Sequence, residues 1–215
     1  MRLGCFGCLI LVVLLFVVVI TVAGVLFLSA NIYGAPDFRP ISYTASDGYV
    51  AQNKLYEIVL RQSGRSSRQD PVVITDREVN AFLARHLKDG GLPMSPLAVR
   101  FSKGQLWLQG QTSLRHLFQA PGLAQLVPYL PARRLDEQVW ITVRGQLSVE
   151  PSLGGSAARY GKVEVSEFWM GRQPISPVIL YVLMGPTGAG FLRWQVPSVV
   201  ETIEIEDGQA LIRTR

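Results

Sequence analysis

The residues that could act as acids, bases or nucleophiles are few. The chain contains 2 histidines, His86 and His116. A catalytic acid or base must lie within hydrogen-bond reach of the group it serves. His86 falls on the apolar side of a predicted helix, where a half-buried packing histidine is expected more often than a base. His116 follows Arg115 and has no acidic neighbour in the sequence, so the chain is expected not to be an enzyme.

Two glycine-containing segments come close to known functional loops. Residues 154–158, Gly-Gly-Ser-Ala-Ala, approach the G-x-S-x-G nucleophile elbow, but that arrangement needs a histidine further along the chain, and none follows His116. Residues 185–190, Gly-Pro-Thr-Gly-Ala-Gly, lack the Lys-Ser/Thr pair of a phosphate-binding loop and follow an apolar segment instead of opening a helix. Both segments are therefore predicted to be ordinary loops.

Four acidic residues near the C-terminus could attract a cation: Glu201, Glu204, Glu206 and Asp207. Glu204 and Glu206 share one face of a predicted strand. A calcium site needs about six to eight oxygen ligands, and the sequence nearby supplies no others. A solvated strand face is the expected arrangement, and neither a metal nor a cofactor is predicted.

The charge balance is mildly basic. The net charge is +5, from 21 basic and 16 acidic residues, and the isoelectric point is near 9.5. The tightest basic group is Arg61, Arg65 and Arg68, which is expected to be either a solvated connection or a contact with anionic lipid headgroups. Because no aromatic residues are interleaved with this group, nucleic acid is not an expected partner.

The N-terminal segment of the chain is predicted to be a membrane anchor. Residues 9–28 carry no charge and are apolar except for Thr21 and Gly24. A helix of this length spans about 30 Å, the hydrocarbon thickness of a bilayer. A cleavable signal is the alternative, but its apolar region usually runs about 7 to 15 residues. Residues 1–30 are therefore predicted to be an uncleaved, single-pass anchor in the cell membrane.

The flanking residues favour one orientation. Arg2 and the amino terminus face only Arg39 on the other flank, which places the N-terminus in the cytoplasm by the positive-inside rule. Both cysteines, Cys5 and Cys8, precede the anchor, as suits a domain in an oxidising, extracytoplasmic space. The Cys-x-x-Cys pair lacks the second ligand pair of a zinc site, so acylation or no role is expected.

The first part of the chain beyond the anchor is predicted to be a linker followed by two helices. Residues 31–45 contain glycine and prolines without apolar periodicity and read as a linker. A helix is predicted over 47–62 with Ser46 as its N-cap and one apolar face, made by Ala51, Leu55, Ile58 and Val59. A second helix begins with a capping box between Thr75 and Glu78 and runs to about Lys88, before Gly90-Gly91.

From residue 97 the apolar period changes to two, which indicates strands with one dry face and one wet face. The predicted strands are 97–102, 105–114, 139–149, 162–168, 200–206 and 209–213. Two apolar stretches interrupt them, 117–135 and 175–184, and the second is expected to be a buried helix or a segment that touches lipid. The sequence thus predicts one α+β domain, residues 46–215, built around a curved antiparallel sheet.

Four segments carry a resemblance to a known group of proteins. They are ITDREVNAFL at 74–83, FSKGQLWLQG at 101–110, VWITVRGQLSVEP at 139–151 and KVEVSEFWMGRQPIS at 162–176. In their order they resemble the YpmS-like uncharacterised envelope proteins of bacteria and, more distantly, the LmeA-like lipid-binding proteins. The resemblance implies an exported, TULIP-like domain whose curved sheet wraps a helix and holds a lipid, with no catalytic residues. The chain departs from this pattern at 117–135 and 185–190.

The expected function is that of an anchored, non-catalytic domain that binds a lipid or another amphiphile. The alternative is a structural or interaction protein that assists an envelope complex. The residues assigned to the lipid-binding surface are Phe82, Leu106, Leu108, Ile141, Val143 and Leu147.

Overall fold

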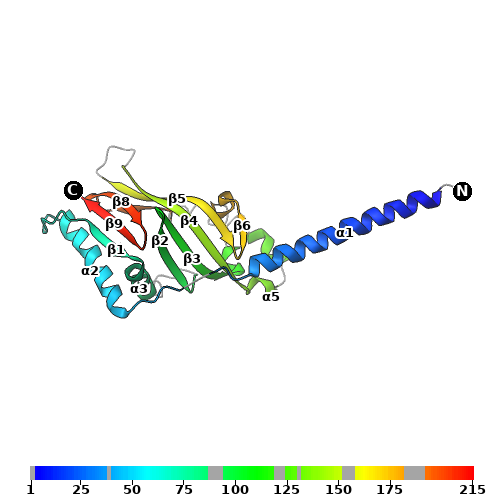
Figure 1. The fold of residues 1–215 in the computed structure, drawn as a ribbon, viewed down its shortest axis with the longest axis horizontal. Coiled ribbons are helices and arrows are strands. Elements are labelled where there is room, and N and C mark those ends of the chain that lie inside the picture. The colour runs from blue at the N-terminus through cyan, green and yellow to red at the C-terminus, as the bar shows by residue number, and fades with distance from the viewer. Residues whose placement is uncertain are drawn as a thin grey trace.

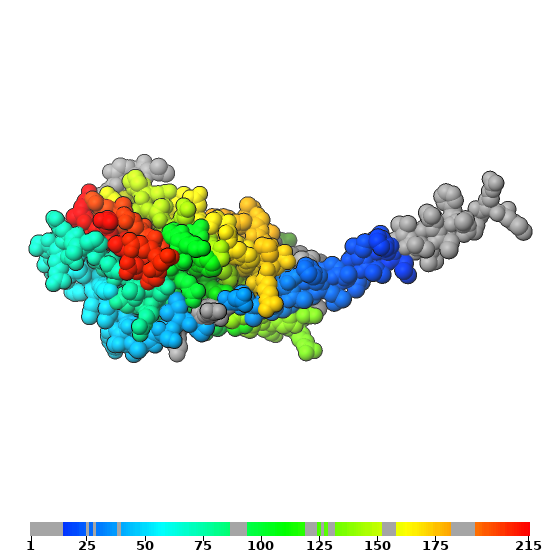
Figure 2. Space-filling model, in the orientation of Figure 1, coloured from blue at the N-terminus to red at the C-terminus, as the bar shows by residue number. Residues whose placement is uncertain are grey.

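The computed structural model describes residues 3–37, 40–86, 94–118, 124–129, 132–151, 158–181 and 192–215. A long N-terminal helix, α1 (Leu3–Tyr33), stands away from an α+β domain (Figure 1). The domain contains two antiparallel sheets, and Figure 2 shows α2, α3 and the last strands grouped at the end of the domain away from α1. The predicted fold class, an apolar helix followed by an α+β domain with a curved antiparallel sheet, is confirmed at that level.

Helix α1 is long and apolar enough to cross a membrane over Leu15–Tyr33. Between Leu15 and Phe27 its described side chains are exposed, for example Phe16 at 64% and Phe27 at 68%. An apolar helix without a protein partner along most of its length fits a membrane span or a signal anchor and not a core helix.

The larger sheet has the strand order β2-β3-β4-β5-β6, and β7 pairs with β5. Its strands are β2 (Leu97–Ser102), β3 (Gln105–Ser113), β4 (Gln138–Pro151), β5 (Arg159–Met170), β6 (Gln173–Ile175) and β7 (Arg193–Val196). All of these pairs are antiparallel. The turn between β2 and β3 has positive φ angles at Lys103 (53°) and Gly104 (74°), the conformation of a tight hairpin whose twist matches its strands.

The smaller sheet has the order β1-β9-β8, from β1 (Val72–Thr75), β8 (Val200–Glu206) and β9 (Gln209–Thr214). It packs against the larger sheet, because Ala210 of β9 belongs to a buried cluster with Val99 and Phe101 of β2. The two hairpin tips are also joined: Asp207 accepts a hydrogen bond from the Lys103 backbone N–H at 2.8 Å. The hydrogen bond from Lys103 stabilises the charged carboxylate and is the main reason why the pKa of Asp207 lies below its ordinary value.

Helix α2 (Ala45–Gln62) begins two residues before the predicted start. Its N-cap is Thr44 and not Ser46, because the Asp47 carboxylate accepts from the Thr44 backbone N–H at 2.7 Å and from its hydroxyl at 2.9 Å. The predicted apolar face is partly wrong: Ala51 and Ile58 are buried, but Val59 is 50% exposed.

Helix α3 (Asp76–His86) confirms the predicted capping box. The Glu78 carboxylate accepts from the Thr75 backbone N–H at 2.9 Å, and the Glu78 N–H donates to the Thr75 hydroxyl at 3.3 Å. The same carboxylate is buried and forms an ion pair with Lys54 of α2 at 2.7 Å. The cap therefore also ties α2 to α3. The predicted end of this helix beyond His86 lies outside the described residues.

Two further residues of this motif hold the edge of the larger sheet. The buried Asn80 side chain donates to the Val99 carbonyl at 2.6 Å and accepts from the Val99 N–H at 2.8 Å. Asp76 accepts from the Phe101 N–H at 2.7 Å. An edge strand presents backbone N–H and C=O groups that no neighbouring strand pairs. In β2, the side chains of Asn80 and Asp76 form hydrogen bonds with three of these groups. Residues 75–80 therefore connect α3 to both α2 and β2.

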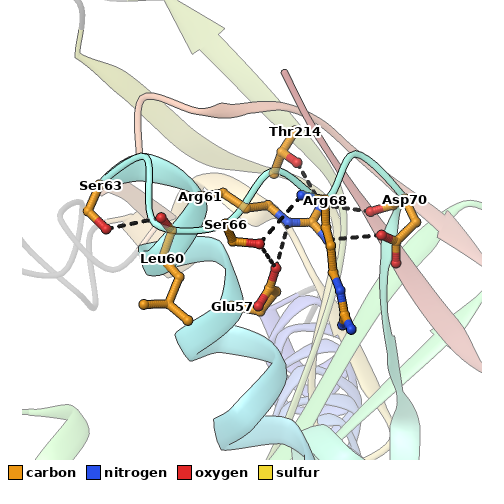
Figure 3. A network of polar contacts seen from close by, with 8 residues as sticks. All are labelled: Glu57, Leu60, Arg61, Ser63, Ser66, Arg68, Asp70 and Thr214. Carbon is orange, nitrogen blue, oxygen red and sulfur yellow. Dashed lines mark hydrogen bonds and ion pairs between the residues drawn. The ribbon is translucent and has the colours of Figure 1, made fainter.

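Figure 3 shows a second polar network where α2 ends, at the end of the domain farthest from α1. Its centre is Arg61, whose side chain is 3% exposed. Arg61 Nη1 donates to the Asp70 carbonyl at 2.7 Å and to the Thr214 hydroxyl at 2.8 Å, which joins α2 to the end of β9. Arg65 and Arg68 are exposed. Both interpretations of this group, a solvated connection and a lipid contact, are wrong for Arg61, because its side chain is buried and hydrogen-bonded inside the domain. For Arg65 and Arg68 both remain predictions.

The two apolar stretches contain short helical segments. Residues 114–135 include α4 (Leu114–Leu117), η1 (Ala124–Tyr129) and α5 (Ala132–Leu135). The second stretch begins with β6 and continues as a helical turn over 177–181, of which Leu180 is buried. The remainder of that stretch and the glycine-containing segments 154–158 and 185–190 include residues outside the described ranges.

Candidate functional site

Five of the six residues assigned to the lipid-binding surface lie on one face of the larger sheet. Leu108 of β3 stands opposite Val143 of β4, and Leu106 stands opposite Gly145. Ile141, Val143, Gly145 and Leu147 are two residues apart along β4, so their side chains and a Cα hydrogen of Gly145 lie on the same side of the sheet. The structure therefore brings Leu106, Leu108, Ile141, Val143 and Leu147 together.

Strand β5 extends this apolar face. Phe168 stands opposite Val143 and Val163 stands opposite Leu147, although a register shift lies between the two pairs. Ser166 is the extra residue, since Arg144 pairs with Glu167 and Gly145 pairs with Val165. A bulge of this kind keeps both halves of a strand facing the same side while bending the sheet. It therefore curves the sheet without interrupting the apolar face.

Among the described residues, the cover of this apolar face is incomplete. Its buried members are Ile141, Val163, Val165, Phe168 and Leu180, and the partly exposed ones are Met94, Leu106, Leu117, Val143, Leu147, Met170, Ile175 and Leu192. Phe168 is 1% exposed and forms the floor of this cluster, which we call the sheet-face cluster. Leu180 covers it from the helical turn after β6. The half-buried side chains are those that could meet an apolar ligand.

The sixth residue, Phe82, is elsewhere. It lies in an open hollow of about 530 Å³ between α2 and α3, and its ring centroid is 4.4 Å from that of His86. The hollow is lined by Gln52, Asn53, Leu55, Tyr56, Val59, Phe82 and His86. Helix α3 turns Val79 and Leu83 toward the sheets instead. The prediction that His86 is half-buried is wrong, because it stands at the open edge of this hollow and is exposed.

The opposite face of the larger sheet carries an aromatic and arginine stack. The Arg144 guanidinium lies 3.2 Å from the Trp107 ring centroid and 4.8 Å from that of Trp169, and it forms an ion pair with Glu167 at 3.0 Å. Stacked cations of this kind stabilise neighbouring strands by about 0.5–2 kcal/mol. In the sequence, tryptophan and arginine alternate with apolar residues here, and this pattern indicates only a wet face because it does not show which side chains stack.

The predicted linker crosses this face. Residues 31–33 continue α1, and the following chain brings Asp37 and Ile41 beside Arg100, Trp107 and Gln109 around a hollow of about 50 Å³. Asp37 and Ile41 of the predicted linker therefore lie against β2 and β3.

The second histidine is part of a helix cap. Ser113 is the N-cap of α4, and its hydroxyl lies 2.7 Å from His116 Nδ1. The same hydroxyl accepts from the His116 backbone N–H at 3.4 Å. A nucleophilic serine needs a base that a third group orients, whereas this contact is local and satisfies the start of a short helix.

The acidic residues near the C-terminus are engaged with neighbouring chain. Glu204 forms an ion pair with Arg213 at 3.1 Å, and Glu206 accepts a hydrogen bond from Gln209 at 2.8 Å. Within the described ranges no group of three or more metal-ligating side chains is gathered in a way that could hold an ion. These contacts fit the expected solvated face of a strand.

Comparisons with known proteins identify no relative: no family model, no curated protein and no solved structure matches the chain. The geometry of the chain itself is therefore what supports a function.

Proposed function

We propose that this protein is a membrane-anchored, non-catalytic domain that holds a lipid or a similar amphiphile against the sheet-face cluster. The proposal agrees with the resemblance to YpmS-like and LmeA-like envelope proteins. Four assigned residues, Leu106, Ile141, Val143 and Leu147, belong to this cluster, whereas Leu108 lies on the same face of the sheet but packs against the buried cluster of Val99, Phe101 and Ala210.

The observation that carries the proposal is the incomplete cover of this face. Within the cluster, Val143 remains partly exposed although it stands opposite the fully buried Phe168, and Leu147 remains partly exposed opposite the buried Val163. Burying apolar surface stabilises by about 25 cal/mol per Å², so an acyl chain laid over these side chains would gain affinity without any polar recognition. Ligand sites in proteins are lined mainly by apolar side chains with a small number of polar groups, and this face has that composition.

Enlarging a side chain on this face tests the proposal. Leu147→Trp should displace bound lipid while changing the free energy of unfolding little, because the added ring would take the space of the acyl chain. In a filled core the same enlargement would cost about 1–3 kcal/mol. The measurement is lipid copurified with the full-length protein, by mass spectrometry, together with denaturant unfolding. Gln146→Trp, on the exposed opposite face, is the matched control and should change neither quantity.

We further propose that the domain lies outside the cytoplasm, because Arg2 and the amino terminus outweigh the single Arg39 on the other flank. In a Cys5→Ser, Cys8→Ser protein, a cysteine at the exposed position of Gln146 should react with a membrane-impermeant thiol reagent in intact cells, once any outer membrane is permeabilised. Labelling only after lysis would place the domain in the cytoplasm.

A second function is favoured by a different surface. Helix α2 exposes Tyr49, Val50, Tyr56 and Val59, and at about 100° per residue Tyr49, Tyr56 and Val59 fall within one arc of about 80°. Exposed apolar surface on a small domain marks an interaction site when it is contiguous. This surface favours the alternative of a structural or interaction protein in an envelope complex, which predicts a protein adduct on photo-crosslinking from Tyr56.

A further inference from the structure

The end of α1 is fixed to the domain. The Arg172 backbone N–H donates to the Asn31 carbonyl at 2.8 Å, and Arg172 Nε donates to the Ala35 carbonyl at 2.8 Å. Gly171, in the turn between β5 and β6, has a φ of 60°, and a side chain there would overlap the Ile32 carbonyl oxygen. The helix therefore enters the domain at the β5–β6 turn without a free linker between them.

The apolar part of α1 continues up to this contact. The candidate membrane span is Leu15–Tyr33. Its last polar side chains are satisfied within the helix, since Ser29 donates to the Leu26 carbonyl at 2.9 Å and Asn31 donates to the Phe27 carbonyl at 3.1 Å. Polar groups bonded in this way can remain in hydrocarbon. If α1 spans a bilayer, the β5–β6 turn therefore lies close to the membrane surface.

The helical turn at 177–181 lies at this same end of the domain. It follows β6, which lies beside the end of α1 (Figure 1). Leu180 is 5% exposed, whereas Val178, Ile179 and Tyr181 are 66%, 45% and 44% exposed. Successive residues of a helix are about 100° apart, so Val178 lies nearly opposite Leu180, and Ile179 and Tyr181 lie on the two flanks of the turn. All three are exposed while Leu180 packs in the sheet-face cluster.

We propose that residues 177–181 form a second membrane contact, in which Val178, Ile179 and Tyr181 enter the interfacial layer of the bilayer that holds α1. The inference rests on the proposed membrane anchor and adds a surface to it. Short apolar segments lie in the interface with their apolar side buried, and tyrosine is favoured at headgroup level. A bilayer is the occupant because α1 and the β5–β6 turn fix this end of the domain beside it.

Depth-dependent fluorescence quenching tests the contact in the full-length protein. Ile179→Cys, in a Cys5→Ser, Cys8→Ser background, is labelled with an environment-sensitive nitrobenzoxadiazole and placed in nanodiscs of phosphatidylcholine and phosphatidylglycerol. Brominated phosphatidylcholine should quench most of its emission. The control is the same label at Val59, which is 50% exposed on α2 and should not be quenched. Equal quenching at the two positions would overturn the proposal.

Together with the lipid that copurifies with the full-length protein, measured by mass spectrometry before reconstitution, this quenching separates the membrane contact from the lipid-binding proposal. Quenching at residue 179 in a protein that retains no lipid on its sheet face would uphold the membrane contact and reject lipid binding. Retained lipid without quenching at residue 179 would reject the membrane contact and uphold lipid binding. A label at Val178, the most exposed of the three side chains, should repeat the result at residue 179, and its failure to do so would count against the proposed helix orientation.

Discussion

Phe168→Ala should lower the free energy of unfolding by about 3–5 kcal/mol, the usual cost of deleting a fully buried aromatic ring. Phe168 is 1% exposed and stands on β5 opposite Val143 and Ile175. Leu180 belongs to the same cluster and covers the floor from the other side. The loss should be measured as a shift of the denaturant midpoint with an unchanged slope.

Phe82→Ala is the matched control for this substitution. Phe82 stands in an open hollow and touches His86 and the exposed side of α2, so its truncation should cost only about 1 kcal/mol from the apolar area it covers. Equal losses at Phe82 and Phe168 would contradict the placement of Phe82 outside the core.

Asn80→Ala should be comparably severe for a different reason. The Asn80 side chain is 2% exposed and is the partner of both backbone groups of Val99. Its removal leaves two buried groups unsatisfied, at about 1–3 kcal/mol each, so the expected loss is roughly 2–6 kcal/mol. Chemical denaturation measures the loss, and faster hydrogen exchange at the Val99 amide should accompany it.

Two further variants sharpen this result. Asn53→Ala removes an exposed asparagine of α2 and should change stability by no more than about 0.5 kcal/mol. Asn80→Asp keeps an acceptor for the Val99 N–H but loses the donors to the Asp76 and Val99 carbonyls, so it should remain strongly destabilised. A stable Asn80→Asp protein would show that the donors contribute little.

The long strands were predictable because their apolar period of two is sustained. Strands β2, β3 and β8 begin or end where the alternation predicted them, and β4 extends only slightly beyond it. The shortest strands, β1, β6 and β7, were missed because they contain 3 or 4 residues. Such a length cannot show a period, and their pairing partners decide their conformation.

The misplacement of Phe82 has a similar cause. Helix α3 packs against the sheets through Val79 and Leu83 and against α2 on another side, where Ala81 approaches Gly48 closely. The helical period showed which residues are apolar, but not which neighbour each side would meet. The burial of Arg61 was likewise not predictable. One of its partners is the Asp70 backbone carbonyl, which leaves no mark in the sequence, and the other, the Thr214 hydroxyl, is distant along the chain.

The apolar face of the candidate site was predictable from the sequence, but its cover was not. Alternation along β3 and β4 placed Leu106, Leu108, Ile141 and Val143 on one face, and the structure confirms that they share it. The Leu180 cover was not predictable, because the apolar run that contains it has no period that distinguishes its buried side from its exposed side.

The most direct test of the central claim is photo-crosslinking from the sheet face. A diazirine analogue of leucine, nearly isosteric with the natural side chain, is placed at Leu147 of the full-length protein in its native membrane, and adducts are identified by mass spectrometry. The control is the same analogue at Leu55, a half-buried leucine that lines the hollow beside α2. Lipid adducts at Leu147 and none at Leu55 are the expected result. Adducts to protein alone at Leu147, or lipid adducts at Leu55 in place of Leu147, would contradict the claim.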